Sequence, residues 1–258
     1  MGILDFLFRR SRPVQTTAPT VVDHFAARRE RRDLRWRQLL ENVEQPYELV
    51  PGAQAETKFE AARVLGQTQK FCPLIIQPGF DAPIRSDPIS LKNSNVRTPE
   101  EYFGWRAHGL VADTDWNGLA LFEEVKEVEP TAAQGLYMTD MLSPTRPVSL
   151  LAEVAILRLP CTESWKIPLF VPIGERTCGE EIGIQKQWYE RFGAELCSVG
   201  DRYWQFRVAR PPRNDEEAVE LLRQHYLYQW VDGAYDKEAI ENGAAALRVA
   251  THWMFFWE

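Results

Sequence analysis

A run of oxygen-bearing side chains is the sharpest chemical pattern in the sequence. Asp113, Asp115 and Asn117 stand at positions one, three and five of a twelve-residue segment, and Gly118 and Glu124 stand at positions six and twelve. This is the spacing of an EF-hand calcium loop. The glycine allows the sharp turn, and the final glutamate can bind Ca²⁺ through both of its oxygens. The pattern therefore yields a calcium-site hypothesis.

The same segment also fits a β-hairpin. Residues 109–112 and 119–125 would be the strands, and Asn117-Gly118 the turn between them. Asn-Gly is a strong hairpin signal. The incoming helix is also interrupted at Gly109. We therefore favour the hairpin and keep calcium binding as the second hypothesis.

A cysteine and two histidines could support nucleophilic catalysis if the fold brought them together. Cys178 lies in a polar loop, His225 on an apolar helical stripe and His252 among bulky residues. Histidines in such positions are more often core residues, so we predict no catalytic role for them. The alternative is an enzymatic or small-ligand site in loops 174–180 and 228–236, with Asp232 in the second loop. Signatures of serine hydrolases, zinc proteases, phosphate loops and dinucleotide folds are missing from the sequence.

The four cysteines, Cys72, Cys161, Cys178 and Cys197, form no Cys-x-x-Cys pair. This spacing excludes a zinc ribbon and a thioredoxin-type redox motif. The first residues lack the order of a signal peptide. We expect free thiols, no resident cofactor and a cytoplasmic protein.

The charge of the chain is unevenly distributed. Residues 1–37 hold nine arginines and four acids, whereas residues 38–258 hold 21 basic and 33 acidic residues. An acidic body repels nucleic acid and attracts basic partners. We therefore predict a basic protein partner and no nucleic-acid partner.

Tryptophans beside charged or turn residues are candidates for the surface that binds this partner, because exposed tryptophans often anchor protein interfaces. The predicted partner-binding residues are Trp105, Trp116, Trp230, Asp232, Glu180 and Glu181.

The N-terminal part divides into three segments before the body. Residues 1–12 are apolar and then basic, too short to span a bilayer, and fit at most a membrane-surface contact. Together with a Pro/Thr-rich linker they make up residues 1–22. A charged helix follows at 23–45, then a subdomain at 46–150 and a C-terminal domain at 151–258.

Alternating helical and strand patterns predict a mixed α/β fold, with a mixed sheet covered by helices. Helices are expected at 53–69, 98–108, 181–193, 214–229 and 237–249, and strands at 71–77, 148–159, 169–173, 195–199, 203–209 and 251–258. Both faces of the last segment are apolar, which is typical of a central strand.

Several stretches of the C-terminal part resemble a bacterial family known as domain of unknown function 4253. They are Trp165-Lys-Ile-Pro168, Gln187-Trp-Tyr-Glu-Arg-Phe-Gly-Ala-Glu195, Arg210-Pro-Pro212 with the acid-rich helix after it, and the aromatic ending Trp253–Glu258. The resemblance covers about residues 154–258 and implies a bacterial origin and a fold, but no reaction. The chain departs from the family pattern at Gly174–Glu180, where members often carry Gly-Gly-Trp-Asn-x-Cys-Pro, and near 228–232, where a Cys-Pro-Asp run is missing.

These observations favour a non-enzymatic, partner-binding protein. The most concrete form is an immunity-type protein that neutralises a basic bacterial toxin, such as a nuclease. Its acidic surface would mimic the toxin's phosphate substrate and speed capture.

Overall fold

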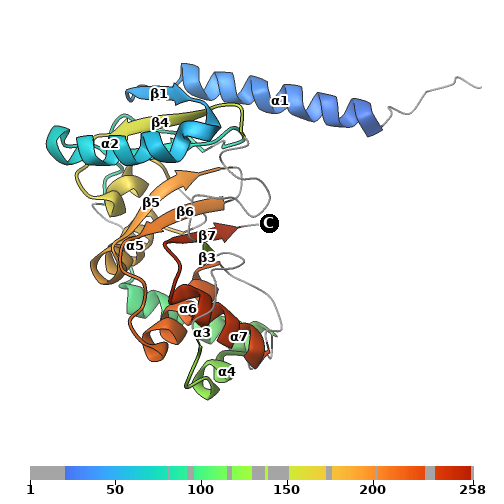
Figure 1. Ribbon diagram of the computed structural model, residues 1–258, viewed down its shortest axis with the longest axis vertical. Coiled ribbons are helices and arrows are strands. Elements are labelled where there is room, and N and C mark those ends of the chain that lie inside the picture. Colours follow the sequence, from blue (N-terminus) through green and yellow to red (C-terminus); the bar gives the residue numbers. More distant parts are fainter. Residues whose placement is uncertain are drawn as a thin grey trace, which may run out of the picture.

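A computed structural model describes residues 21–80, 82–91, 96–114, 118–129, 137–138, 151–172, 176–200, 203–229 and 236–256. These residues form a seven-stranded mixed sheet with the strand order β1-β4-β2-β5-β6-β7-β3 (Figure 1). Helices pack against both faces of the sheet. The predicted α/β class is confirmed.

The strands are β1 (Tyr47–Val50), β2 (Cys72–Ile76), β3 (Tyr137–Met138), β4 (Val154–Leu159), β5 (Ala194–Val199), β6 (Tyr203–Val208) and β7 (His252–Phe256). Only β2 and β5 pair in parallel, and the other neighbours are antiparallel. Strand β7 is buried along most of its length. It lies between β6 and the two-residue β3, so it is one strand from the edge of the sheet.

The helices are α1 (Val21–Glu41), α2 (Ala55–Gln69), α3 (Pro99–Thr114), α4 (Gly118–Glu124), α5 (Cys178–Phe192), α6 (Asp215–Gln229) and α7 (Lys237–Leu247), with short 3₁₀ turns η2 (Gly52–Gln54) and η4 (Ser164–Leu169). Helix α1 extends past the edge of the sheet (Figure 1) and is anchored by the buried Trp36. Across the described residues, none of the helices combines the length and the apolarity needed to cross a bilayer.

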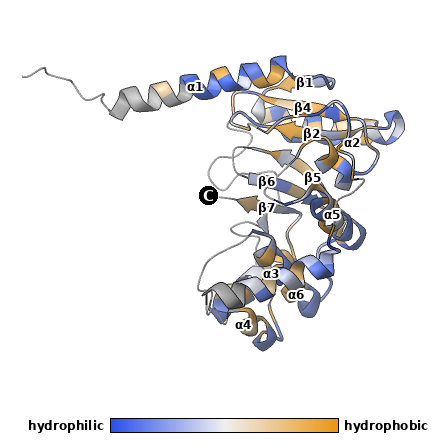
Figure 2. Ribbon diagram, turned by 180° about the vertical axis from the view of Figure 1, so that it is seen from behind, coloured by the Kyte–Doolittle hydropathy of each residue, from blue (hydrophilic) through white to orange (hydrophobic). Residues whose placement is uncertain are grey.

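Two apolar clusters lie on opposite faces of the sheet. The smaller one joins Phe59 of α2 to residues of β1, β2, β4 and β5. The larger one joins the other sheet face to α5, α6 and α7, and Trp188 lies at its centre, fully buried against Phe206, Trp253 and Phe255. Apolar residues are concentrated in the strands, whereas the outer sides of the helices are more hydrophilic (Figure 2).

Strands of both predicted segments share this one sheet. Strand β4, from the predicted C-terminal domain, lies between β1 and β2 of the preceding segment. The boundary proposed at residue 150 falls outside the described residues.

Side-chain caps fix the start of several helices. Thr98 and Glu101 exchange hydrogen bonds as a capping box at the start of α3. The Asn214 side chain accepts a hydrogen bond from the amide of Glu217 at the start of α6. Such caps satisfy amides that have no partner within the helix. A third capping box, between Thr177 and Glu180, starts α5 three residues earlier than the apolar periodicity indicated.

Gly193 ends α5 in a left-handed conformation, with φ of 61°. We expect Gly193→Ala to destabilise the protein by roughly 1–3 kcal/mol, because left-handed backbone is unfavourable for alanine. An added Cβ would also lie 2.8 Å from Cβ of Ala209. Urea unfolding measures the effect. The matched control is Gly104→Ala in α3, where a Cβ meets nothing within 4 Å. This change should stabilise by about 0.5–1 kcal/mol, and equal losses in both variants would contradict the prediction.

The predicted hairpin at 109–125 is wrong. Helix α3 continues through Gly109 to Thr114, and residues 118–124 form α4. Gly109 does not have a positive φ, so it does not act as a helix stop. Phe122 is buried against Tyr226 of α6, with ring centroids 5.3 Å apart. This tertiary burial favours the helix over the local Asn-Gly turn signal.

The predicted strand at 169–173 is also wrong. Residues 164–169 form η4, which has Pro168 inside it. The carbonyls of Leu169 and Phe170 accept hydrogen bonds from the amides of Ile89 and Arg85. The segment is therefore held by two isolated backbone bonds rather than by a sheet ladder.

Candidate functional site

Of the possible site at 174–180 and 228–236, the structure describes 176–180, 228–229 and 236. Most of these residues belong to α5 and α6, and residues 176 and 228 are in contact. Arg176 makes this contact. Its Nη2 donates to the backbone carbonyl of Tyr228 at the end of α6, and its guanidinium lies 3.7 Å from the Tyr228 ring centroid. Its Nε donates to the hydroxyl of Tyr102 in α3 at 2.9 Å. One arginine thus joins α3, α6 and the start of α5.

Glu181 is the anionic partner of Arg176 and is fully buried. Its Oε2 lies 3.3 Å from Nη1 of Arg176, and its Oε1 accepts hydrogen bonds from the Tyr228 hydroxyl and from Nε2 of Gln185. Burial and the nearby Glu181 carboxylate hold the pKa of Tyr228 well above its ordinary value, so the phenol stays protonated and donates. The buried charges of Arg176 and Glu181 compensate each other. We call these two residues, together with Tyr102 and Tyr228, the clamp.

Glu180, the neighbouring predicted partner-binding residue, is buried as well. Its carboxylate caps α5 through Thr177 and lies 2.6 Å from Nη1 of Arg97. Burial alone would raise the pKa of Glu180, but the hydrogen bonds from Thr177 and Arg97 outweigh it, so the pKa lies below its ordinary value. Both glutamates are therefore committed to internal contacts, and neither presents the exposed acid that the partner-binding prediction required.

Trp105 is half exposed, at 49%, as a partner-binding residue would be. Arg97 lies over its ring at 4.4 Å from the centroid. The other candidates, Trp116, Trp230 and Asp232, lie outside the described residues. Their roles stay predictions.

The three residues considered for nucleophilic catalysis, Cys178, His225 and His252, are surrounded by different side chains. The Cys178 thiol donates to the carbonyl of Pro168, and burial together with Glu181 raises its pKa, so it is not an activated thiolate. His225 is enclosed by Trp188, Trp253, Phe255 and Tyr137.

His252 lies elsewhere, on β7, where its register partner on β6 is Arg207. The described geometry therefore does not assemble a cysteine–histidine pair from these three residues.

Most of the residues of the possible calcium site lie outside the described part of the chain. Asp115 and Asn117 are not described, nor is the side chain of Asp113, whereas Glu124 is exposed at the end of α4. Among the described residues no group of three or more His, Cys, Asp or Glu side chains is placed to hold a metal ion. Calcium binding stays a prediction.

A groove lies between α6 and the segment formed by α4 and the residues that follow it. It encloses about 650 Å³ and is lined by Phe122, Glu123, Val125, Lys126, Glu216, Val219, Glu220 and Arg223. Its apolar members are buried, and its charged members lie on α4, on α6 and at Lys126, which follows α4. Sequence reasoning missed this groove because it predicted strands where α4 lies.

The groove lies in an acidic part of the molecule. Residues 118–129 and 215–223 together hold eight acidic and two basic residues. Glu123 and Glu216 are exposed, and neither has an ion-pair partner within the part of the chain that the structure describes. Asp215, in contrast, is neutralised by Arg248 and accepts from the amide of Val128 at 3.2 Å. The lining also holds Lys126 and Arg223, so three acids face two bases in the groove itself, and Glu123 and Glu216 are the exposed acids without an ion pair among the described residues.

Helices α5, α6 and α7 and strands β4 to β7 form the C-terminal part that carries the clamp. Residues 155–258 match the DUF4253 family, a domain of unknown function. The match includes Arg176, Glu181 and Tyr228, whereas Tyr102 and α4 precede it. The DUF4253 segment thus contributes one side of the groove, and the preceding segment contributes the other. No curated protein and no solved structure shows significant similarity to the chain.

Proposed function

We propose that this protein binds a basic protein partner in the groove between α4 and α6. The observation that carries the proposal is the pair of exposed acids, Glu123 and Glu216, which lie beside an apolar floor and have no ion-pair partner among the described residues. Complementary charge speeds association and suppresses wrong partners. The most concrete form is an immunity-type protein that neutralises a basic toxin, such as a nuclease, in the bacterial cytoplasm.

The volume of the groove is compatible with side chains from a partner. About 650 Å³ lies within the range typical of ligand sites. Arginine or lysine side chains of a partner could place their charged ends at Glu123 and Glu216 and their alkyl stems against Val125 and Val219. In a nuclease these would be the side chains that bind phosphate, so occupying them would block its substrate.

A charge-reversed pair tests this proposal. We expect Glu123→Lys/Glu216→Lys to weaken binding of the basic partner at least about tenfold at about 50 mM salt, and by less at about 300 mM, where charges are screened. The partner is captured from native cells on the wild-type chain, identified by mass spectrometry, purified and then titrated against both chains.

The matched control is Glu44→Lys/Glu153→Lys, which makes the same charge change at two exposed positions outside the groove. This control should retain most of the affinity. Equal weakening by both double variants would indicate only long-range attraction, and an unchanged affinity of the groove variant would overturn the proposal.

A further inference from the structure

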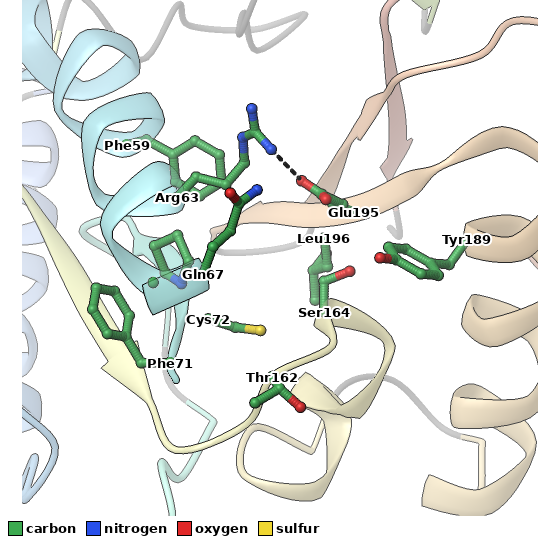
Figure 3. Close-up of a pocket in the computed structure, with 12 residues that line it drawn as sticks. Phe59, Arg63, Gln67, Phe71, Cys72, Thr162, Ser164, Tyr189, Glu195 and Leu196 are labelled. Atoms are coloured by element: carbon green, nitrogen blue, oxygen red, sulfur yellow. Dashed lines mark ion pairs between the residues drawn. The ribbon is translucent and has the colours of Figure 1, made fainter. Parts of the chain in front are cut away.

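A small cavity lies away from the groove, between α2, β2, η4, α5 and the start of β5. It encloses about 100 Å³. That is room for about three water molecules, or for an organic molecule of about four to five non-hydrogen atoms. Its walls include Phe59, Phe71 and Tyr189 (Figure 3). Its polar side chains include Arg63, Gln67, Thr162, Ser164 and Glu195. None of these residues lines the groove between α4 and α6.

Tight local packing builds the cavity wall at the end of α2. A Cβ at Gly66 would lie 2.3 Å from the carbonyl oxygen of Phe71. Lys70 closes the helix in a left-handed conformation, with φ of 64°. The chain therefore turns sharply from α2 into β2 and holds Phe71 and Cys72 against the cavity.

Glu195 lacks a hydrogen-bond donor of its own. Within the described residues its carboxylate has one ion-pair contact, from Nη1 of Arg63 at 3.9 Å, which is beyond hydrogen-bond reach. Its side chain is 22% exposed. Burial raises the pKa of Glu195, against the opposing effects of Arg63 and Arg207. The carboxylate of Glu195 is thus partly buried, remains open to the cavity and has no protein donor, so a ligand that carries a hydrogen-bond donor can bind to it.

Ser164 adds a second unsatisfied oxygen. Its Oγ is buried and has no hydrogen-bond partner in the part of the chain that the structure describes. Figure 3 shows the hydroxyls of Ser164 and Tyr189 pointing toward each other across the cavity. Two oxygen acceptors and aromatic walls are the chemistry that recognises an ammonium group.

The charges around the cavity are balanced, and Glu195 is the acid that lacks a close partner. Glu60 is shared between Arg63, whose Nε lies at 3.0 Å, and Arg207, whose Nε lies at 2.9 Å. With Glu195 this makes two acids and two arginines, so the local net charge is zero. Arg63 already has Glu60 as a close anionic partner, whereas Glu195 has none within hydrogen-bond distance.

We propose that this cavity binds a small organic cation that carries a primary ammonium group. The ammonium donates to Glu195 and Ser164, and its short alkyl chain packs against Phe59 and Phe71. The binding site is separate from the groove proposed for the protein partner.

Isothermal titration with three probes of equal size tests the ligand class. Propylammonium, 1-propanol and acetate each have four non-hydrogen atoms, so they differ in charge rather than in bulk. A ligand of this size binds no tighter than on the order of tens of micromolar, and the titration therefore extends to about 50 mM. We expect propylammonium to bind at least about tenfold more tightly than either other probe. Tighter binding of acetate, equal binding of propanol, or no binding of propylammonium would overturn the proposal.

Substitutions in the cavity test whether propylammonium binds there. Glu195→Gln should weaken propylammonium at least about tenfold, and Ser164→Ala about threefold, because a charged hydrogen bond is stronger than a neutral one. Glu190→Gln removes an exposed carboxylate of α5 and should leave the affinity unchanged. The groove variant Glu123→Lys/Glu216→Lys should also leave it unchanged, which separates this test from that of the proposed function. Full affinity in Glu195→Gln would overturn the assignment.

Discussion

Replacing Arg176 by methionine should destabilise the protein by about 3–5 kcal/mol, because the change leaves a buried carboxylate without its cationic partner. The side chains of Arg176 and Glu181 are 9% and 1% exposed. Methionine fills much of the volume of arginine but cannot donate to Glu181, to Tyr102 or to the carbonyl of Tyr228. Urea unfolding at pH 7, followed by circular dichroism, measures the loss.

The adjacent pair on the same helix turn supplies a matched control. Arg97 also pairs with a glutamate of α5, Glu180, but the Arg97 side chain is 45% exposed. Glu180 is buried too, but without Arg97 it keeps the hydrogen bonds from the amide and the hydroxyl of Thr177. Water can also take the place of the exposed arginine, so Arg97→Met should destabilise by only about 1 kcal/mol. Similar losses of stability in Arg176→Met and Arg97→Met would contradict the prediction that the buried pair of the clamp contributes more than the exposed one.

A double-mutant cycle separates the ion pair from the rest of the clamp. Adding Glu181→Gln to Arg176→Met removes the buried charge. The double variant should therefore be more stable than the sum of the two single losses, by about 1–3 kcal/mol. Additive losses would show that packing, and not the charge, accounts for the effect.

The clamp could not be predicted from the sequence. The partners of Arg176 lie 74 and 52 residues away, at Tyr102 and Tyr228, and such contacts leave no local pattern in the chain. In contrast, the apolar residues Ile184, Trp188 and Phe192 repeat with the helical period. This local pattern underlies the predicted helix at 181–193, and the three residues are buried in α5. The strands at 195–199 and 203–209 were predicted for the same reason, since each has its own local signal, and the structure pairs them antiparallel as β5 and β6.

The groove escaped prediction for a related physical reason. A short apolar run between turn residues fits either a strand or a helix, and only the contact of Phe122 with Tyr226 decides between them. The acidic excess of residues 38–258 was visible in the sequence. The position of that charge, above a concave surface made by two separate helices, depends on the tertiary fold.

Lowering the pH from 7 to 5 should destabilise the protein by about 4 kcal/mol through two buried histidines, about 2 kcal/mol for each. Burial lowers the pKa of His225 well below its ordinary value of 6.5. Burial and Arg207 lower that of His252 to about 4, against an opposing effect of Glu60. Between these folded-state values and 6.5 the unfolded chain binds more protons, so stability is lost as the pH falls below 6.5.

Urea unfolding at pH 7 and pH 5 measures this difference, and the variant His225→Phe/His252→Gln should remove most of it. The rings around His225 are aromatic, so a phenylalanine fits there chemically. The carboxylates contribute little in this window, because the ordinary pKa of Glu180, 4.5, lies below pH 5 and its folded value is lower still. Glu195, whose pKa is raised, acts in the opposite direction, since its protonation at low pH favours the folded state.

The control is His108→Gln, at an exposed position of α3, which should keep the full difference in stability between pH 7 and pH 5. If the double variant His225→Phe/His252→Gln also kept it, groups other than these two histidines would govern the acid sensitivity.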